Sequence, residues 1–336
     1  MGISILAIGS AFGSRCVTND DLVKVFPQWT PEKLYAKTKI ASRPVCAEDE
    51  TSLDLAETAC RDALYLSGIA LEKIDYLILC TQSPDYSLPP NSTILQHRLG
   101  LPHHIGCFDF SHGCSGYVYG LSLASAVINS GQANTVLLVT AESYSKYLSE
   151  RDSVCRPIFG DGATATLLQA SHDTKGPRSF VFLTDGSRSD LLIRPASGAR
   201  AAAVQALGLH PEAVADGLRS LEHIYMNGAA IFSYTLEAVP FLLNSVLEKE
   251  RRTIEQIDKF VFHQANGFIL DHLRLKCKIP SEKFIVELES VGNTVSSSIP
   301  VALKAAMKDG RIQNNEDIFL VGFGVGLSSC ACILTV

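Results

Sequence analysis

Ser111-His112-Gly113-Cys114-Ser115-Gly116 is the stretch that decides the fold, because a run of small and apolar residues at helical spacing follows it directly. The pattern predicts a helix over Ser115–Ser130, with the Cys114 thiol at its amino end. Unsatisfied backbone N–H groups at a helix amino end favour negative charge, so we expect them to lower the pKa of this thiol. Cys114 is therefore a candidate nucleophile.

Two further polar residues lie at the ends of predicted strands or helices. His263 ends an apolar strand and opens the polar run His263-Gln264-Ala265-Asn266, and Asn293 follows Gly292 ahead of a helical pattern. Alone, His263 fits an ordinary loop residue and Asn293 fits a helix cap. A Cys, a His and an Asn from three separate loops can, however, form a covalent acyl-transfer site.

Short apolar runs alternate with helical periods along the whole chain, which indicates an α/β fold with strands buried on both faces. The predicted strands are Ile3–Ile8, Tyr76–Cys80, Thr135–Thr140, Ala163–Leu168, Phe260–His263, Phe319–Gly322 and Ser329–Leu334. The predicted helices are Leu53–Ser67, Ser115–Ser130, Gly228–Glu248 and Ile299–Lys308.

The chain also repeats itself weakly at long range. The segment 71–79 aligns with 254–262, and a nearly equal offset aligns 137–139 with 319–321 and the helix after Cys114 with the helix after Asn293. We therefore expect a duplicated unit, with an N-terminal half over 1–170 and a C-terminal half over 224–336. The segment 171–223 fits the repeat poorly and is expected to be an insertion or connecting loop.

Composition narrows the class of protein. The 336 residues are 46% hydrophobic and 19% charged, and the net charge of −6 argues against a general nucleic-acid binder. No uncharged apolar run reaches the length of a membrane span, and the amino terminus does not resemble a signal peptide. The ten cysteines include no Cys-x-x-Cys pair, so we expect a reducing, cytoplasmic setting, and we expect no metal site.

Seven motifs, in this order and spacing, resemble the β-ketoacyl-acyl-carrier-protein synthase III family of the thiolase superfamily. The resemblance covers essentially the whole chain. The motifs are Thr81-Gln82-Ser83-Pro84-Asp85-Tyr86, the Cys114 loop, Phe159-Gly160-Asp161-Gly162-Ala163, Met226-Asn227-Gly228, His263-Gln264-Ala265-Asn266, Gly292-Asn293-Thr294 and Gly322-Phe323-Gly324-Val325-Gly326.

The resemblance implies a thiolase fold, in which two αβαβα halves form a five-layer sandwich, and a homodimer. It implies that an acyl thioester, commonly of coenzyme A, acylates the cysteine. A malonyl thioester, delivered by an acyl carrier protein, then loses CO₂ and attacks the acyl group. No permanently bound cofactor is implied, and neither nucleic acid nor membrane is expected as a partner.

The resemblance also assigns roles to individual residues. Cys114 is the nucleophile, and His263 and Asn293 hold the enolate that decarboxylation forms. The backbone N–H groups of Cys114 and Val325, the latter in the turn Gly324-Val325-Gly326, form the oxyanion hole for the acyl carbonyl. Asn266 orders water or orients the histidine.

Several positions depart from the family pattern. In a gap-free alignment, Lys33 stands at the family's tryptophan, Lys37 opens Lys37-Thr38-Lys39-Ile40 in place of Arg-Thr-Gly-Ile, and Phe268 replaces an arginine. Another family arginine falls on Ser153, although Arg151 lies close. Lysine lacks the planar fork with which arginine grips phosphate. We expect altered recognition of the donor or carrier, and a role in a specialised pathway.

The acyl pocket is expected to include Leu88 and Phe159. Leu88 matches a position where the family inserts a side chain, commonly phenylalanine, across the dimer. A leucine there is expected to leave a pocket of different shape, open to longer or branched acyl groups.

Other interpretations stay open. Some relatives transfer the acyl group to an alcohol or amine without decarboxylation. A cysteine hydrolase of the α/β-hydrolase type would explain the elbow-like motif around Cys114, but His112 would crowd its tight turn. A binding subunit without activity would have no need of all three polar residues. A thiolase proper would carry a second cysteine in the turn at Val325.

Overall fold

The computed structural model describes residues 2–173, 175–204 and 219–336. Its strands are β1 Gly2–Phe12, β2 Arg15–Thr18, β3 Ser42–Val45, β4 Tyr76–Cys80, β5 Gly106–Phe110, β6 Thr135–Glu142, β7 Gly162–Ser171, β8 Gly176–Thr184, β9 Leu192–Ile193, β10 Tyr225–Met226, β11 Lys259–Phe262, β12 Phe284–Ile285, β13 Asp317–Gly324 and β14 Ser328–Thr335. The labelled helices are α1 Asn19–Val25, α2 Pro31–Thr38, α3 Ser52–Ser67, α4 Asn91–Leu99, α5 Gly116–Asn129, α7 Gly228–Glu250, α8 Gly267–Lys276 and α9 Ser298–Lys308.

Two five-stranded sheets have the same order and the same strand directions. The first runs β1-β7-β6-β4-β5 and the second runs β8-β14-β13-β11-β12. In each sheet three neighbouring strands are parallel, the fourth is antiparallel to them, and the fifth pairs antiparallel with the fourth. The duplication expected from the sequence is therefore present in the topology.

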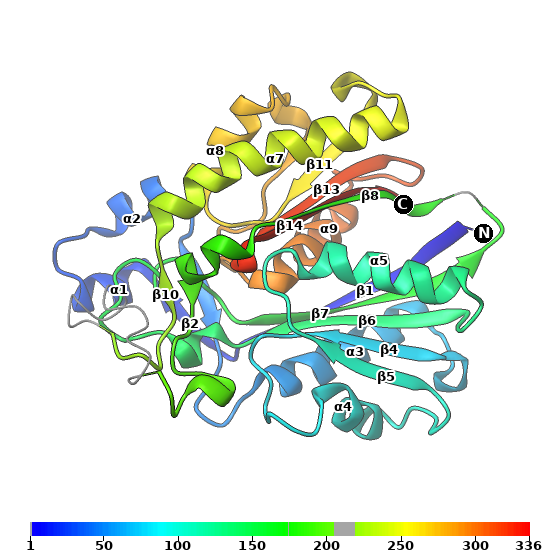
Figure 1. The fold of residues 1–336 in the computed structure, drawn as a ribbon, viewed down its shortest axis with the longest axis horizontal. Helices are drawn as coiled ribbons and strands as arrows, with labels where there is room; N and C mark the ends of the chain where they lie inside the picture. The colour runs from blue at the N-terminus through cyan, green and yellow to red at the C-terminus, as the bar shows by residue number, and fades with distance from the viewer. Residues whose placement is uncertain (1, 174, 205–218) are drawn as a thin grey trace.

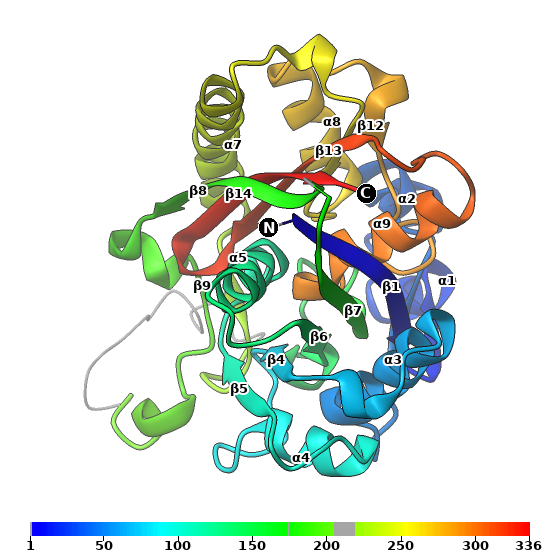
Figure 2. The ribbon, with the colours of Figure 1, turned by 90° about the vertical axis from the view of Figure 1, so that its right-hand side faces the viewer.

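The two sheets enclose a central layer of helices. Helices α5 and α9 pack between the sheets in one hydrophobic cluster that contains residues of both (Figure 1, Figure 2). Helices α3 and α4 cover the outer face of the first sheet, and α7 and α8 cover the outer face of the second. This is the five-layer αβαβα sandwich of the thiolase fold, as predicted.

The strands and helices expected from the sequence are all present, although their ends shift by a few residues. The half-buried strand β5 and the strand β8 were not predicted. β8 lies inside the segment 171–223 but pairs with β14, so the sheet of the C-terminal half begins at Gly176. Residues 174 and 205–218 of that segment lie outside the described residues.

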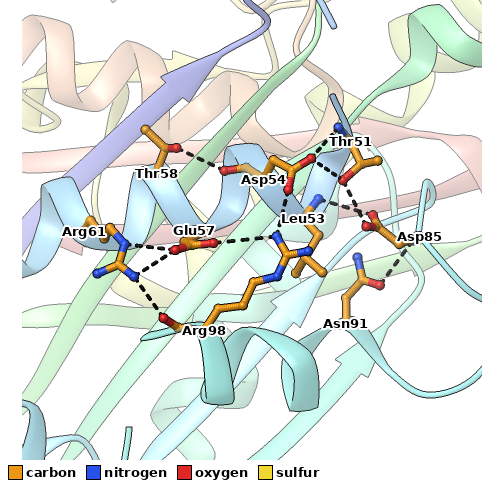
Figure 3. A network of polar contacts seen from close by, with 9 residues as sticks. All are labelled: Thr51, Leu53, Asp54, Glu57, Thr58, Arg61, Asp85, Asn91 and Arg98. Atoms are coloured by element: carbon orange, nitrogen blue, oxygen red, sulfur yellow. Dashed lines mark hydrogen bonds and ion pairs between the residues drawn. The ribbon is translucent and has the colours of Figure 1, made fainter. Parts of the chain in front are cut away.

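A polar network anchors the loop between β4 and α4 (Figure 3). Thr51 and Asp54 form the capping box at the start of α3. The Asp85 carboxylate accepts hydrogen bonds from the Thr51 hydroxyl at 2.9 Å and from the Leu53 N–H at 3.4 Å. Because Asp85 precedes Leu88 by three residues, this network fixes the base of the loop that carries Leu88.

Helix α7 is the one helix in the described residues with the length and apolar character of a membrane span. Its apolar face packs on β8, β13 and β14 of the second sheet and belongs to the same hydrophobic cluster as Phe319 and Ala331. Half of its most apolar window is buried in this way. α7 is therefore a core helix, as Figure 2 also shows from its position over β8 and β14.

Candidate active site

One cavity of about 750 Å³ brings together the three residues that the sequence singled out. Cys114, His263 and Asn293 all line it, although they come from loops far apart in the chain. Cys114 comes from the first half of the fold, and the other two come from the second half. The cavity therefore lies where the two halves meet.

Cys114 lies between β5 and α5 and is only 5% exposed. The strand end at Gly324 passes so close that an added Cβ would stand 2.8 Å from the Cys114 sulfur. The backbone N–H groups of Cys114 and Val325 point at that sulfur. These two backbone N–H groups, which are expected to form an oxyanion hole, therefore face the nucleophile, one from each half of the fold.

The resting thiol does not have the lowered pKa expected at a helix amino end. Burial raises the pKa of Cys114 to about 12, and the nearby Glu142 carboxyl adds to the rise. The two backbone N–H groups act in the expected direction but are outweighed. The expectation was wrong because the sequence does not show how deeply the sulfur is buried.

Glu142 is a buried carboxyl that the sequence analysis missed. It accepts hydrogen bonds from the hydroxyls of Ser83 and Ser296 and from the Gln82 N–H. Burial raises its pKa to about 8. The carboxyl is therefore mostly uncharged at neutral pH, which spares the Cys114 site from a full negative charge.

His263 is a neutral imidazole. Its side chain is buried, its ring meets Phe323 edge-on at 5.4 Å, and desolvation lowers its pKa to about 3. The ring is held by a contact between Nδ1 and the Ser298 Oγ at 2.7 Å. A neutral ring can donate one hydrogen bond without leaving a permanent charge in the cavity.

Ser298 contacts the ring at Nδ1, and its Oγ also accepts a hydrogen bond from the Gln264 N–H at 3.3 Å. In one tautomer the Ser298 hydroxyl donates to Nδ1, and Nε2 carries a hydrogen that can be donated to a ligand. In the other tautomer Nδ1 donates to Ser298, and Nε2 accepts from Asn293 Nδ2 at 3.4 Å. Ser298 is the first residue of α9, and the sequence analysis assigned it no role.

Asn293 supplies a second donor beside the first. Its Oδ1 accepts from the Val295 N–H at 2.8 Å, which turns Nδ2 toward His263 Nε2 at 3.4 Å. Two neutral donors that lie this close can share one oxygen atom. A backbone bridge holds the residue in place, because its N–H bonds to the Ile158 oxygen and its oxygen accepts from Gly160.

The other predicted site residues do not all line the cavity that contains Cys114. Phe159 lines the cavity and is buried. Asn266 also lines it, but its side chain caps α8 through the Ile269 N–H, and no hydrogen bond among the described residues links it to His263. Gly326 borders a neighbouring cavity, and Leu88 is 82% exposed on its loop.

The residues at the cavity mouth differ from the predicted set. Lys37 and Phe268 line it, whereas Lys33 and Arg151 are exposed and do not. Trp29, the single tryptophan of the chain, lines the mouth and lies under the Lys37 ammonium at 5.0 Å. The alignment missed it because it stands four residues before the position expected for a tryptophan.

The described residues include no group of three His, Cys, Asp or Glu side chains arranged to hold a metal ion. The polar groups gathered at the cavity are a thiol, an imidazole, a carboxamide and backbone amides. This set suits acyl transfer through a covalent thioester.

We expect Ser298→Ala to slow any step that uses the His263 Nε2–H by about 10-fold, because the ring loses its hydrogen-bond partner at Nδ1. Ser298→Thr keeps the hydroxyl and should recover most of the rate. Single-turnover decarboxylation of a malonyl thioester is the measurement. Ser125→Ala, which removes another buried helix hydroxyl, is the matched control. Equal rates for Ser298→Ala and wild type would show that the Ser298 contact does not orient the His263 ring for this step.

Comparison with known proteins is consistent with this geometry. The family described as 3-oxoacyl-[acyl-carrier-protein] synthase III matches residues 108–186, and its C-terminal counterpart matches residues 247–336. The β-ketoacyl-[acyl-carrier-protein] synthase III of Clostridium perfringens is 34% identical, over 95% of this chain and 94% of its own.

Solved structures of the same family also superpose on this chain. A crystal structure of a 3-oxoacyl-(acyl-carrier-protein) synthase III superposes with a TM-score of 0.94 and 42% identity, over the full length of both chains. The priming β-ketosynthase of the R1128 polyketide biosynthetic pathway superposes with a TM-score of 0.86 and 28% identity, over 99% of this chain and 96% of its own.

Proposed function

Because this chain belongs to the 3-oxoacyl-[acyl-carrier-protein] synthase III family, we propose that it condenses an acyl thioester with a malonyl thioester through an acyl-Cys114 intermediate. The observation that carries the proposal is the single cavity shared by Cys114, His263 and Asn293. The pairing of two neutral donors 3.4 Å apart supports a step in which negative charge develops on one oxygen.

The first half-reaction uses the sulfur. The Cys114 sulfur attacks the acyl carbon, and the backbone N–H groups of Cys114 and Val325 hold the oxygen of the tetrahedral intermediate. The carbon–sulfur bond to coenzyme A then breaks, and the coenzyme A thiol leaves with the proton of the cysteine. Because the pKa of the resting thiol is raised to about 12, the sulfur must lose its proton in the course of the attack.

The second half-reaction uses the two donors. The carbon–carbon bond of the malonyl carboxylate breaks, CO₂ leaves, and the electron pair becomes an enolate whose oxygen lies between His263 Nε2–H and Asn293 Nδ2–H. The enolate carbon attacks the acyl carbon on Cys114. The sulfur leaves as thiolate and takes one proton from solvent, which restores the thiol and releases a β-ketoacyl thioester.

We further propose a specialised pathway, with substrates other than those that start bulk fatty acid synthesis. Lys37 and Phe268 at the mouth support this, because a lysine and a phenylalanine stand where the family has arginines. The likeness to a priming ketosynthase of a polyketide pathway supports it at the level of the family. A cytoplasmic location fits the family and the cysteine usage.

We also propose a homodimer. β5 pairs only with β4 among the described strands, which leaves a free sheet edge, and Leu88 projects from a loop nearby in the same half. A monomer by light scattering at assay concentration would contradict this.

The reaction class can be tested with one assay. We expect the protein to release one CO₂ from malonyl carrier protein for each β-ketoacyl product, after a stoichiometric mass increase on Cys114. Intact-protein mass spectrometry with a panel of acyl-CoA thioesters identifies the preferred donor. Acyl transfer without CO₂ would instead indicate ester or amide formation. Efficient and selective use of acetyl-CoA would rule out the specialised donor.

A further inference from the structure

A second cavity, of about 370 Å³, lies beside the candidate active site. It contains one cationic side chain and no lining carboxylate among the described residues. Its lining residues are Gln82, Ser111, Tyr144, Tyr147, Ser189, Leu192, Ile193, Arg194, Ser197, Ile224, Val325 and Gly326. We call this the Arg194 cavity.

The Arg194 cavity shares walls with the nucleophile's surroundings. Leu192 lines both cavities, and Val325, whose N–H points at the Cys114 sulfur, borders the Arg194 cavity. Gly113 fits between two of its lining residues, since an added Cβ would stand 2.6 Å from Gln82 Oε1 and 2.7 Å from a Val325 methyl. The Arg194 cavity therefore lies directly behind the loop that holds Cys114.

Tyr144 forms part of the partition between the two spaces. Its ring packs on Phe159 with centroids 5.2 Å apart, and both belong to the hydrophobic cluster that contains Cys114. Its hydroxyl donates to Gln82 Oε1 at 2.5 Å. An acyl chain attached to the Cys114 sulfur would therefore pass from the apolar side chains around the sulfur to the polar groups near the Tyr144 hydroxyl.

Arg194 is held in a fixed position. Its guanidinium lies 4.1 Å above the Tyr147 ring, and its Nε donates to the Glu222 backbone oxygen at 2.6 Å. Within the described residues its two terminal nitrogens have no hydrogen bond and no ion pair. A half-buried guanidinium held on one face and at Nε presents its remaining edge to a planar oxyanion.

Neither Glu142 nor Asp85 forms an ion pair with Arg194 among the described residues. Glu142 and Asp85 are close enough to influence the pKa of Tyr147. Glu142 is mostly uncharged at neutral pH because burial raises its pKa, and the Asp85 carboxylate is hydrogen-bonded to Thr51. No ion pair of Arg194 is present among the described residues, so its terminal nitrogens can bind a ligand oxyanion.

We propose that the Arg194 cavity receives the far end of the acyl group and that Arg194 binds a carboxylate there. The acyl donor would then be the monothioester of a short dicarboxylic acid. This inference rests on the proposed function. The chemistry at Cys114 is unchanged, since the distal carboxylate forms only hydrogen bonds and is carried intact into the β-keto product.

The test compares matched pairs of donors that differ only in the distal carboxylate: butyryl-CoA with succinyl-CoA, and pentanoyl-CoA with glutaryl-CoA. The rate of mass increase on Cys114 is the readout. We expect wild type to react at least about 10-fold faster with the dicarboxylic member of one pair. Arg194→Leu should lower that rate about 10- to 100-fold and change the neutral member's rate far less. Arg194→Lys should fall between, because it keeps charge without the fork.

Arg188→Leu is the matched control, since Arg188 is an exposed arginine of the same region that pairs with Asp185 and does not line the cavity. It should keep the wild-type preference. If Arg194→Leu fails to fold by thermal unfolding, Arg194→Gln makes the same comparison with a polar side chain.

Several outcomes would overturn the inference. One is faster reaction of the neutral member in both pairs, with Arg194→Leu unchanged. Another is an equal rise in KM for every thioester in Arg194→Leu, which would place the arginine at coenzyme A. The third is no adduct with any thioester, and in that case the proposed function itself falls. An adduct that forms readily without carboxylate preference removes only this inference.

Discussion

Cys114→Ala is expected to abolish acyl transfer, with a loss of about 10⁴-fold or more, because no other group can carry the acyl chain between the two half-reactions. The other buried thiol of the same cluster, Cys155, does not line the cavity. The measurement is the mass of the intact protein after incubation with acyl-CoA thioesters, together with the rate of β-ketoacyl product formation.

Cys155→Ala is the matched control for Cys114→Ala. It removes a sulfur of similar burial from the same cluster, so it should keep the adduct and most of the rate. An adduct that persists in Cys114→Ala, or one that maps to another cysteine, would refute the assignment of the nucleophile. Loss of the adduct in both variants would point to a damaged fold, which thermal unfolding would reveal.

His263→Ala is expected to separate the two half-reactions. Decarboxylation should slow by about 10²- to 10³-fold, because the enolate oxygen loses one of its two donors. Acylation of Cys114 should change much less, since its oxyanion relies on backbone N–H groups. CO₂ release from a malonyl thioester and mass increase on Cys114 measure the two steps independently. Asn293→Ala should show the same separation.

The pH dependence offers a second readout for His263. Its folded pKa of about 3 lies below the usual 6.5, so the ring stays neutral as pH falls through 6.5. Wild-type decarboxylation should therefore show no loss with a midpoint near 6.5. His97→Ala, which removes an exposed histidine on α4, should behave as wild type. A midpoint near 6.5 that His263→Ala removes would contradict the buried, neutral ring.

Much of the fold could be predicted because buried strands and helices leave strong periodic patterns. β4 and β6 are continuous apolar runs, and α3 begins at a recognisable capping box. β5 and β8 were missed for the opposite reason. Both are mostly half-buried and mix polar with apolar residues, so their sequences resemble loops until a neighbouring strand is known.

The candidate site was predictable only in part. Cys114, His263 and Asn293 stand at element ends, where motif spacing makes them visible. Ser298 and Glu142 were not predicted, because their roles depend on partners far away in the chain that only folding brings close. The raised pKa of Cys114 was missed for a related reason, since burial comes from residues of both halves.

The bridge between Phe159 and Asn293 separates substrate range from reaction chemistry. It is made by main-chain groups alone, so the Asn293 amide, which we propose to hold the enolate, keeps its place whatever side chain stands at position 159. That side chain can therefore change in size during divergence, and reshape the room for the acyl tail, without displacing the condensation machinery. A protein with this arrangement can accept different acyl groups during divergence and still form the same carbon–carbon bond.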